Sequence, residues 1–81
     1  MLARFRRKLT KKETDKTDEL IKTNPEVKVI SIDWTLGSYD GVLVGEAPDA
    51  EAWLKFVEPM GEYLISETLV AFPRERVLKI I

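Results

Sequence analysis

The chain has 81 residues, contains neither cysteine nor histidine, and carries a formal net charge of −1. This length gives one domain, residues 1–81, and the two absences exclude thiolate nucleophiles, Ser-His triads, imidazole catalysis and zinc sites built from Cys or His. A chain this short buries only about 60–65% of its unfolded surface, so self-association is the expected further source of stability when disulfides are missing.

Basic residues are concentrated at the start of the chain. Residues 1–12 hold six Lys and Arg and no acid, whereas fourteen acids and seven bases follow. Such a segment is either a basic arm that contacts nucleic acid or a membrane, or a degenerate first strand with a solvated end. We favour the solvated end and expect neither of these partners. The chain shows no signal peptide and no apolar run of ~20 residues, which predicts a cytoplasmic protein.

The first nine residues fit either a strand or a helix. Ala3, Phe5 and Leu9 lie on one alternating face, whereas Leu2, Phe5 and Leu9 also fit a helical spacing. We favour a strand, because the elements that follow need one to complete a sheet.

A helix is predicted from Glu13 to Thr23, with Thr10 or Thr14 as its cap and Asn24–Pro25 as its end. Its first half is polar. The clearest strand follows at Val27–Thr35 and is rich in β-branched residues.

A tight turn then leads to a returning strand at Tyr39–Ala47. Gly41 and Gly45 within this strand indicate a bulge, or a place where another group approaches the backbone closely. The two strands therefore form a hairpin.

Asp49 is expected to cap a second helix, which Pro59 and Gly61 end. Its apolar stripe at positions i, i+3, i+4 and i+7 consists of Ala50, Trp53, Leu54 and Val57. A third firm strand is predicted at Tyr63–Phe72, and a tail at residues 74–81 follows. The order of elements predicts an α+β domain of ferredoxin-like βαββαβ plan, an antiparallel sheet with two helices on one face.

Both faces of the predicted sheet are apolar. The first face carries Ile30, Ile32, Trp34, Val42, Val44, Val70 and Phe72. The second face carries Val27, Val29, Leu43, Ile65, Leu69 and Ala71. Two helices cover only one of these faces, so the other needs a second cover. The tail is short for this purpose, and we expect a homodimer in which a second copy lays its sheet on the open face.

Three motifs resemble a known family. Trp34–Asp40, Glu46–Ala52 and Ser66–Pro73 are similar, in this order, to the W-T-x-G-x-Y-D turn, the E-A-P-D helix entry and the T-E-T-L-x-A-F-P strand of the GYD domain family. The likeness covers Val27–Glu75, and Ser38 is an insertion within the Gly-Tyr-Asp triplet. It implies the fold of the dimeric α+β barrel group and little about activity.

A weaker resemblance links the chain to the ligand-sensing domain of leucine-responsive (feast/famine) regulators. It is carried by Asn24–Val27, Thr35–Asp40 and Glu67–Leu69. That domain binds amino acids between subunits. Since the chain is too short to include a DNA-binding helix-turn-helix as well, the resemblance implies a stand-alone sensor at most.

The candidate ligand-binding residues are Trp34, Tyr39, Asp40 and Glu67. Asp40 is interpreted as a ligand anchor or proton acceptor, with Tyr39 as a donor, and Trp34 as the wall of a flat-ligand pocket. Other interpretations stay open: Asp40 bonds turn backbone, Tyr39 packs at the sheet edge, and Trp34 belongs to the core. Glu67, an acid on a strand, fits either a cleft or an exposed salt bridge.

These residues predict a small homodimeric binding module for an anionic or aromatic molecule, with its pocket between sheet and helices or at the subunit seam. No cofactor is expected, and no metal, because no loop has the spacing of calcium ligands. The alternative is a cofactor-free enzyme, an isomerase or monooxygenase such as the dimeric α+β barrel group contains, with Asp, Glu or Tyr as catalyst.

Overall fold

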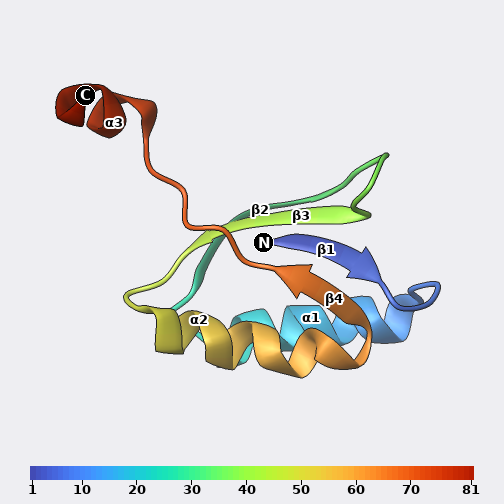
Figure 1. The fold of residues 1–81 in the computed structure, drawn as a ribbon. Helices are drawn as coiled ribbons and strands as arrows, with labels where there is room; N and C mark the ends of the chain where they lie inside the picture. The colour runs from blue at the N-terminus through green and yellow to red at the C-terminus, as the bar shows by residue number, and fades with distance from the viewer.

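The computed structural model describes residues 1–81 as an antiparallel four-stranded sheet with two helices on one face (Figure 1). The elements are β1 (Leu2–Phe5), α1 (Lys11–Thr23), β2 (Lys28–Trp34), β3 (Gly41–Glu46), α2 (Ala50–Val57), the 3₁₀ helix η1 (Glu58–Glu62), β4 (Leu64–Glu67) and α3 (Arg74–Ile80). The strand order is β2-β3-β1-β4. This confirms the α+β fold of ferredoxin-like plan. No helix has the length and apolar character needed to cross a membrane.

The first strand forms where the sequence favoured it, over Leu2–Phe5, and lies between β3 and β4. Ala3 is 5% exposed and belongs to the core. The amino group of Met1 donates to the carbonyl of Leu43 at 2.7 Å, which fixes the start of the chain to β3. Because β1 is a central strand, Leu2–Phe5 of the basic segment, with Arg4, are part of the sheet.

Helix α1 begins at Lys11, two residues before the predicted start, because Thr10 and Glu13 form a capping box. The backbone N–H of Thr10 donates to Glu13 Oε2 at 2.8 Å, and its hydroxyl donates to the same oxygen. Arg7 lies 3.3 Å from the other carboxylate oxygen. The hydrogen bonds from Thr10, more than the charge of Arg7, lower the pKa of Glu13 to about 2.

Strand β2 carries a β-bulge. Val29 pairs with Gly45, whereas Ser31 pairs with the adjacent residue Val44, so Ile30 is the extra residue. At the glycines of the returning strand, the sequence indicated either a bulge or a close approach of another group to the backbone. The bulge lies on the neighbouring strand, opposite Gly45, whereas the close approach is found at Gly45 itself, where a Cβ atom would lie 3.1 Å from the ring of Trp53.

The bulge changes which side chains of β2 face the helices. Beyond it, Ile32 pairs with the buried Leu43, so both lie on the helix side, and Trp34 follows on the same side two residues later. The predicted grouping of these two residues with Val42 and Val44 is wrong, because one inserted residue moves every later side chain of a strand to the other face.

Strand β4 ends at Glu67, five residues before the predicted end. Glu67 pairs with Leu2, the first residue of β1, so the residues that follow have no strand beside them. Ile65 pairs with Arg4 and lies on the face opposite the buried Ala3, which corrects its predicted place. The other corrected residues are outside the sheet: Leu69, Val70, Ala71 and Phe72.

Helix α2 packs on the sheet with a stripe that matches the predicted one only in part. It buries Ala52 and Phe56, and this row with a spacing of four continues to Met60 in η1. Ala50 is exposed and Leu54 is 58% exposed, so both face solvent. Of the predicted stripe, Trp53 and Val57 do pack against the core, whereas Ala50 and Leu54 do not, because the row of Ala52 and Phe56 that runs on into η1 makes the longer contact. The core comprises Ala3, Val27, Leu43, Phe56, Met60, Tyr63 and Leu64.

Candidate functional site

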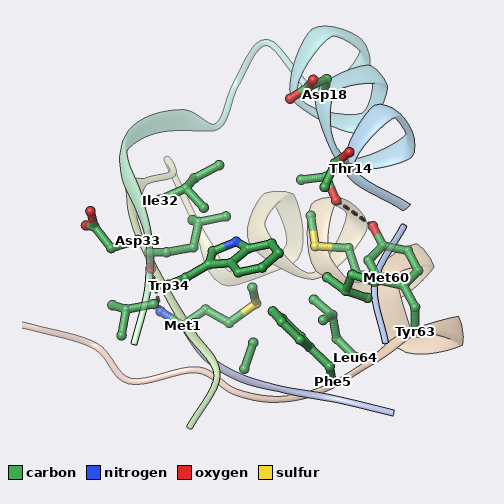
Figure 2. A pocket seen from close by; sticks show the side chains of 16 residues that line it. Met1, Phe5, Thr14, Asp18, Ile32, Asp33, Trp34, Met60, Tyr63 and Leu64 are labelled. Atoms are coloured by element: carbon green, nitrogen blue, oxygen red, sulfur yellow. Dashed lines mark hydrogen bonds between the residues drawn. The ribbon is translucent and has the colours of Figure 1, made fainter. Parts of the chain in front are cut away.

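An apolar groove of about 180 Å³ lies between α1 and the helix side of the sheet. Figure 2 shows the indole of Trp34 at its centre, with the ring of Phe5 beside it. The two ring centroids are 5.3 Å apart with an interplanar angle of 68°, an edge-to-face pair. Trp34 is nevertheless 67% exposed. The groove therefore presents a large, open aromatic surface held by a second ring.

The groove exists because the first half of α1 is polar. The residues of α1 that line it are Thr14, Thr17 and Asp18. The apolar residues of this helix, Leu20 and Ile21, come only near its end and pack on the core. Short polar side chains do not cover an indole, so this part of the sheet stays uncovered.

The polar groups of the groove lie on its α1 side. Thr17 Oγ1 and the hydroxyl of Tyr63 form a hydrogen bond of 2.7 Å, and Asp18 stands at the rim (Figure 2). Asp33 also borders the groove, but its carboxylate points away from it. No lysine or arginine lines the groove. The site can therefore offer the hydroxyls of Thr14, Thr17 and Tyr63 and the carboxylate of Asp18 to the polar end of a ligand whose body is apolar.

Of the four predicted binding residues, only Trp34 lines this groove. Asp40 instead joins the β2–β3 hairpin to β1: its Oδ2 accepts from the backbone N–H of Phe5 at 2.8 Å. Its own N–H donates to Ala3 O at 2.8 Å, and its carbonyl accepts from the N–H of Thr35 at 2.9 Å. These bonds give Asp40 the structural role that the sequence analysis left open as the alternative.

Tyr39 and Glu67 come together on the face of the sheet opposite the groove. The hydroxyl of Tyr39 donates to Glu67 Oε2 at 2.8 Å, and the guanidinium of Arg4 lies 5.1 Å from the centre of the Tyr39 ring. The bond to Glu67 raises the pKa of Tyr39, because it holds the proton next to a negative charge. The four predicted residues therefore do not form one site: Trp34 lines the groove, Tyr39 and Glu67 lie together on the opposite face, and Asp40 joins the hairpin to β1.

Sequence reasoning missed Phe5, Thr17, Met60 and Tyr63 as groove residues. The sequence did contain an indication of these residues: the helix predicted at Glu13–Thr23 is polar in its first half, and it was expected to pack on an apolar sheet. Tracing which strand residues would lie beneath that half would have located the groove.

Replacing Asp40 tests its structural role. Asp40→Ala removes the acceptor of the Phe5 N–H, so we expect the free energy of unfolding to fall by about 1–2 kcal/mol in urea titrations. Asp40→Asn keeps a side-chain oxygen at this position and should retain most of the stability. Equal losses in the two variants would show that the charge of Asp40, and not its hydrogen bond, matters.

Two residues of the basic segment are engaged within the domain. Arg6 Nε donates to Gly61 O at 2.8 Å, and Arg7 donates to Glu62 O at 3.2 Å and to Glu13. These side chains tie the loop after β1 to η1. Across the structure, no three His, Cys, Asp or Glu residues gather where they could hold a metal ion.

Comparison with known proteins agrees with the motifs and the fold. The family model of the GYD domain matches residues 3–81. Neither the curated proteins nor the solved structures contain a significant match to the chain. Since the family model spans nearly all of the sequence, the chain belongs to the GYD domain family.

Proposed function

We propose that the protein is a homodimeric module that binds a small molecule, and that the ligand is a flat, apolar compound placed against Trp34. The observation that carries the proposal is the 67% exposure of this indole inside a groove lined by core residues such as Leu43 and Leu64 and by the polar first half of α1. Binding sites for small molecules are concave and mainly apolar, with a few polar groups that fix orientation. The groove has these properties.

The size and charge of the groove limit the class of ligand. A cavity of about 150 Å³ accommodates benzene, so a groove of about 180 Å³ suits one substituted aromatic ring. The hydroxyls of Thr17 and Tyr63 and the carboxylate of Asp18 favour a neutral or cationic polar group. Of the two ligand classes expected from the sequence, the aromatic one therefore has the stronger support, since the one cationic group among the lining residues, the amino group of Met1, already donates to Leu43 O.

The homodimer is supported by surface that the single chain leaves exposed. The chain exposes 6333 Å², whereas a compact chain of this mass exposes about 5,000 Å². On the face of the sheet away from the helices, Val44 is 45% and Ile65 is 54% exposed. Light scattering should give about twice the chain mass of 9.3 kDa. The cytoplasmic location stays a prediction.

The two tryptophans allow ligand binding to be localised by NMR. The indole N–H of Trp53 donates to Thr68 Oγ1 at 3.0 Å, away from the groove, so it is a built-in control for Trp34. In a screen of aromatic metabolites against ¹⁵N-labelled protein, we expect a ligand to shift the Trp34 indole signal and leave that of Trp53 in place. Trp34→Ala should weaken binding about tenfold or more, which corresponds to about 1.4 kcal/mol.

A second variant separates binding from folding. Leu54→Ala changes an exposed side chain on α2 and should bind as the original protein does. If no aromatic compound moves the Trp34 signal, or if every binder moves both indole signals equally, the groove is not the binding site.

The two alternative functions have less support. The expected catalyst of a cofactor-free enzyme, Asp40, is bonded to backbone, and Tyr39 and Glu67 lie across the sheet from the groove. For contact with nucleic acid, Arg6 and Arg7 of the basic segment are engaged with η1.

A further inference from the structure

The last fourteen residues extend beyond the sheet and contribute nothing to the core. This segment, residues 68–81, is here called the C-terminal arm, and every residue in it is exposed. Figure 1 shows that it leaves β4 and ends in α3, beyond the sheet on the side away from α1 and α2. Its exposed large apolar residues are Leu69, Val70, Phe72, Val77, Leu78, Ile80 and Ile81. Half of the arm is therefore apolar and touches nothing that covers it.

The arm has a strand-forming sequence but no strand to pair with in its own chain. Residues 68–72 continue β4 in the sequence and are rich in β-branched and aromatic residues, which is why a strand was predicted there. Pairing stops because β1 begins opposite Glu67. The backbone of residues 68–72 therefore has no strand partner in this chain, and the apolar side chains of the arm are uncovered, whereas the backbone of α3 forms its own hydrogen bonds.

The amount of uncovered surface matches that of a permanent dimer. The chain exposes 6333 Å², on the order of 1,300 Å² more than a compact chain of its mass. Its radius of gyration is 13.7 Å, against about 11.7 Å for a compact domain of this length. Two copies that each removed this surplus would bury about 2,600 Å², within the range of obligate homodimers.

The face of the sheet away from α1 and α2, here called the open face, complements the arm. The strand register places the apolar residues Leu2, Val42, Val44 and Ile65 on it. The acids Asp33, Glu46 and Glu67 lie on the same face, together with two cations, Lys28, which pairs with Glu46, and Arg4, which pairs with Ile65. The arm carries Arg74, Arg76 and Lys79 against one acid, Glu75. None of these charged residues takes part in an ion pair within the chain.

The arm is long enough to cross a sheet. Its six residues before α3 span about 20 Å when extended, and the seven residues of α3 add about 10 Å. A four-stranded sheet is about 15 Å wide, because neighbouring strands lie about 4.8 Å apart. In the structure the arm already points toward the side of its own sheet on which a second copy would sit (Figure 1).

We propose that two copies of the chain exchange their C-terminal arms, and that each arm crosses the open face of the other copy's sheet. The proposal rests on the homodimer of the proposed function and names the element that forms it. Apolar residues of the arm cover Val42, Val44 and Ile65, and its cations lie near Asp33 and Glu46. The aromatic groove on the other side of the sheet stays free.

A spin label on the arm tests the exchange directly. Since the chain has no cysteine, Glu75→Cys gives one labelling site in the arm and removes neither an apolar contact nor a cation. Spin-labelled, unenriched Glu75→Cys protein is refolded together with ¹⁵N-labelled original protein. We expect loss of NMR intensity at the amides of β3 and at Ile65 of the ¹⁵N chain, with the amides of α1 unaffected.

The outcomes distinguish the exchange from the homodimer. A mass of two chains without any loss of intensity overturns the exchange and leaves the homodimer. If the NMR intensity falls only when the spin label and the ¹⁵N are in the same chain, the arm folds onto its own sheet and the exchange is overturned. Loss at α1 and at the Trp34 indole shows that the arm occupies the groove, which also overturns the proposal. A monomeric mass at all concentrations overturns both exchange and homodimer, whereas ligand binding is measured separately.

A matched pair of substitutions gives a second test. Leu78→Glu places a charge on the arm and Leu54→Glu places the same charge on α2; the two leucines are 49% and 58% exposed. Because neither side chain belongs to the core of the single chain, both variants should fold. We expect Leu78→Glu to raise the dimer dissociation constant tenfold or more and Leu54→Glu to leave it unchanged. Equal dissociation constants would show that the arm does not contribute to the interface.

Discussion

Replacing Phe56 by alanine is expected to lower the free energy of unfolding by about 3–5 kcal/mol. Phe56 is 0% exposed, at the centre of the row by which α2 and η1 pack on the sheet. Its ring also lies 5.6 Å from that of Trp53, at 63°. A domain of this size has about 5–15 kcal/mol of stability in total. The loss should therefore be visible as partial unfolding by circular dichroism at low urea concentration.

Leu54→Ala is the matched control for this prediction, because the two residues lie on the same helix. Leu54 is 58% exposed, so its truncation should change stability by less than about 0.5 kcal/mol. The comparison distinguishes the observed packing from the stripe that the sequence predicted, which included Leu54 and omitted Phe56. A larger loss for Leu54 than for Phe56 would show that α2 packs with the other face.

The order of elements could be predicted because local signals determine it. The Thr10 and Asp49 caps start the two helices, and the side chain of Asp49 accepts from the N–H of Ala52 at 2.8 Å. Asn24–Pro25 ends the first helix, and alternating β-branched residues mark the β2–β3 hairpin. Each of these signals acts within a few residues, so the strand and helix order follows without knowledge of the tertiary structure.

Which side chains of a strand face the helices, and where a strand ends, depend on distant contacts, so these features could not be predicted from local signals. The bulge at Ile30 moves Trp34 from the predicted open face to the groove, and period-two alternation does not show where a residue is inserted. In the same way, β4 ends at Glu67 because the neighbouring strand starts at Leu2. The strand propensity of residues 68–72 carries no information about that neighbour.

The positions of the candidate site residues also depend on distant contacts that the sequence does not show. Trp34 lines the groove because the bulge moves it to the helix side of the sheet, where the polar first half of α1 leaves its indole uncovered. That it binds a ligand stays a prediction. Asp40 looks equally functional in the sequence, yet its carboxylate accepts a hydrogen bond from the N–H of Phe5, a residue thirty-five positions away. Only the pairing of the hairpin with β1 shows that the carboxylate of Asp40 binds a backbone N–H group.

Substitution of Gly45 is the second change for which we expect a large loss of stability, because a side chain at this position would clash with its neighbours. A Cβ atom there would lie 2.9 Å from the carbonyl oxygen of Lys28 and 3.1 Å from the ring of Trp53. The first of these is backbone in the paired strand, opposite the bulge, and cannot rotate away. We expect Gly45→Ala to lower the free energy of unfolding by about 1–3 kcal/mol, as overpacking does in a filled interior.

Gly61→Ala provides the control, since nothing lies within 4 Å of a Cβ atom at that position. In η1 this substitution restricts the unfolded chain without a clash, so the protein should be unchanged or more stable by about 0.4–1 kcal/mol. Urea unfolding of the two variants measures the difference, and the indole signal of Trp53 should move only in Gly45→Ala. If Gly45→Ala were as stable as the original protein, the ring of Trp53 would not lie against β3.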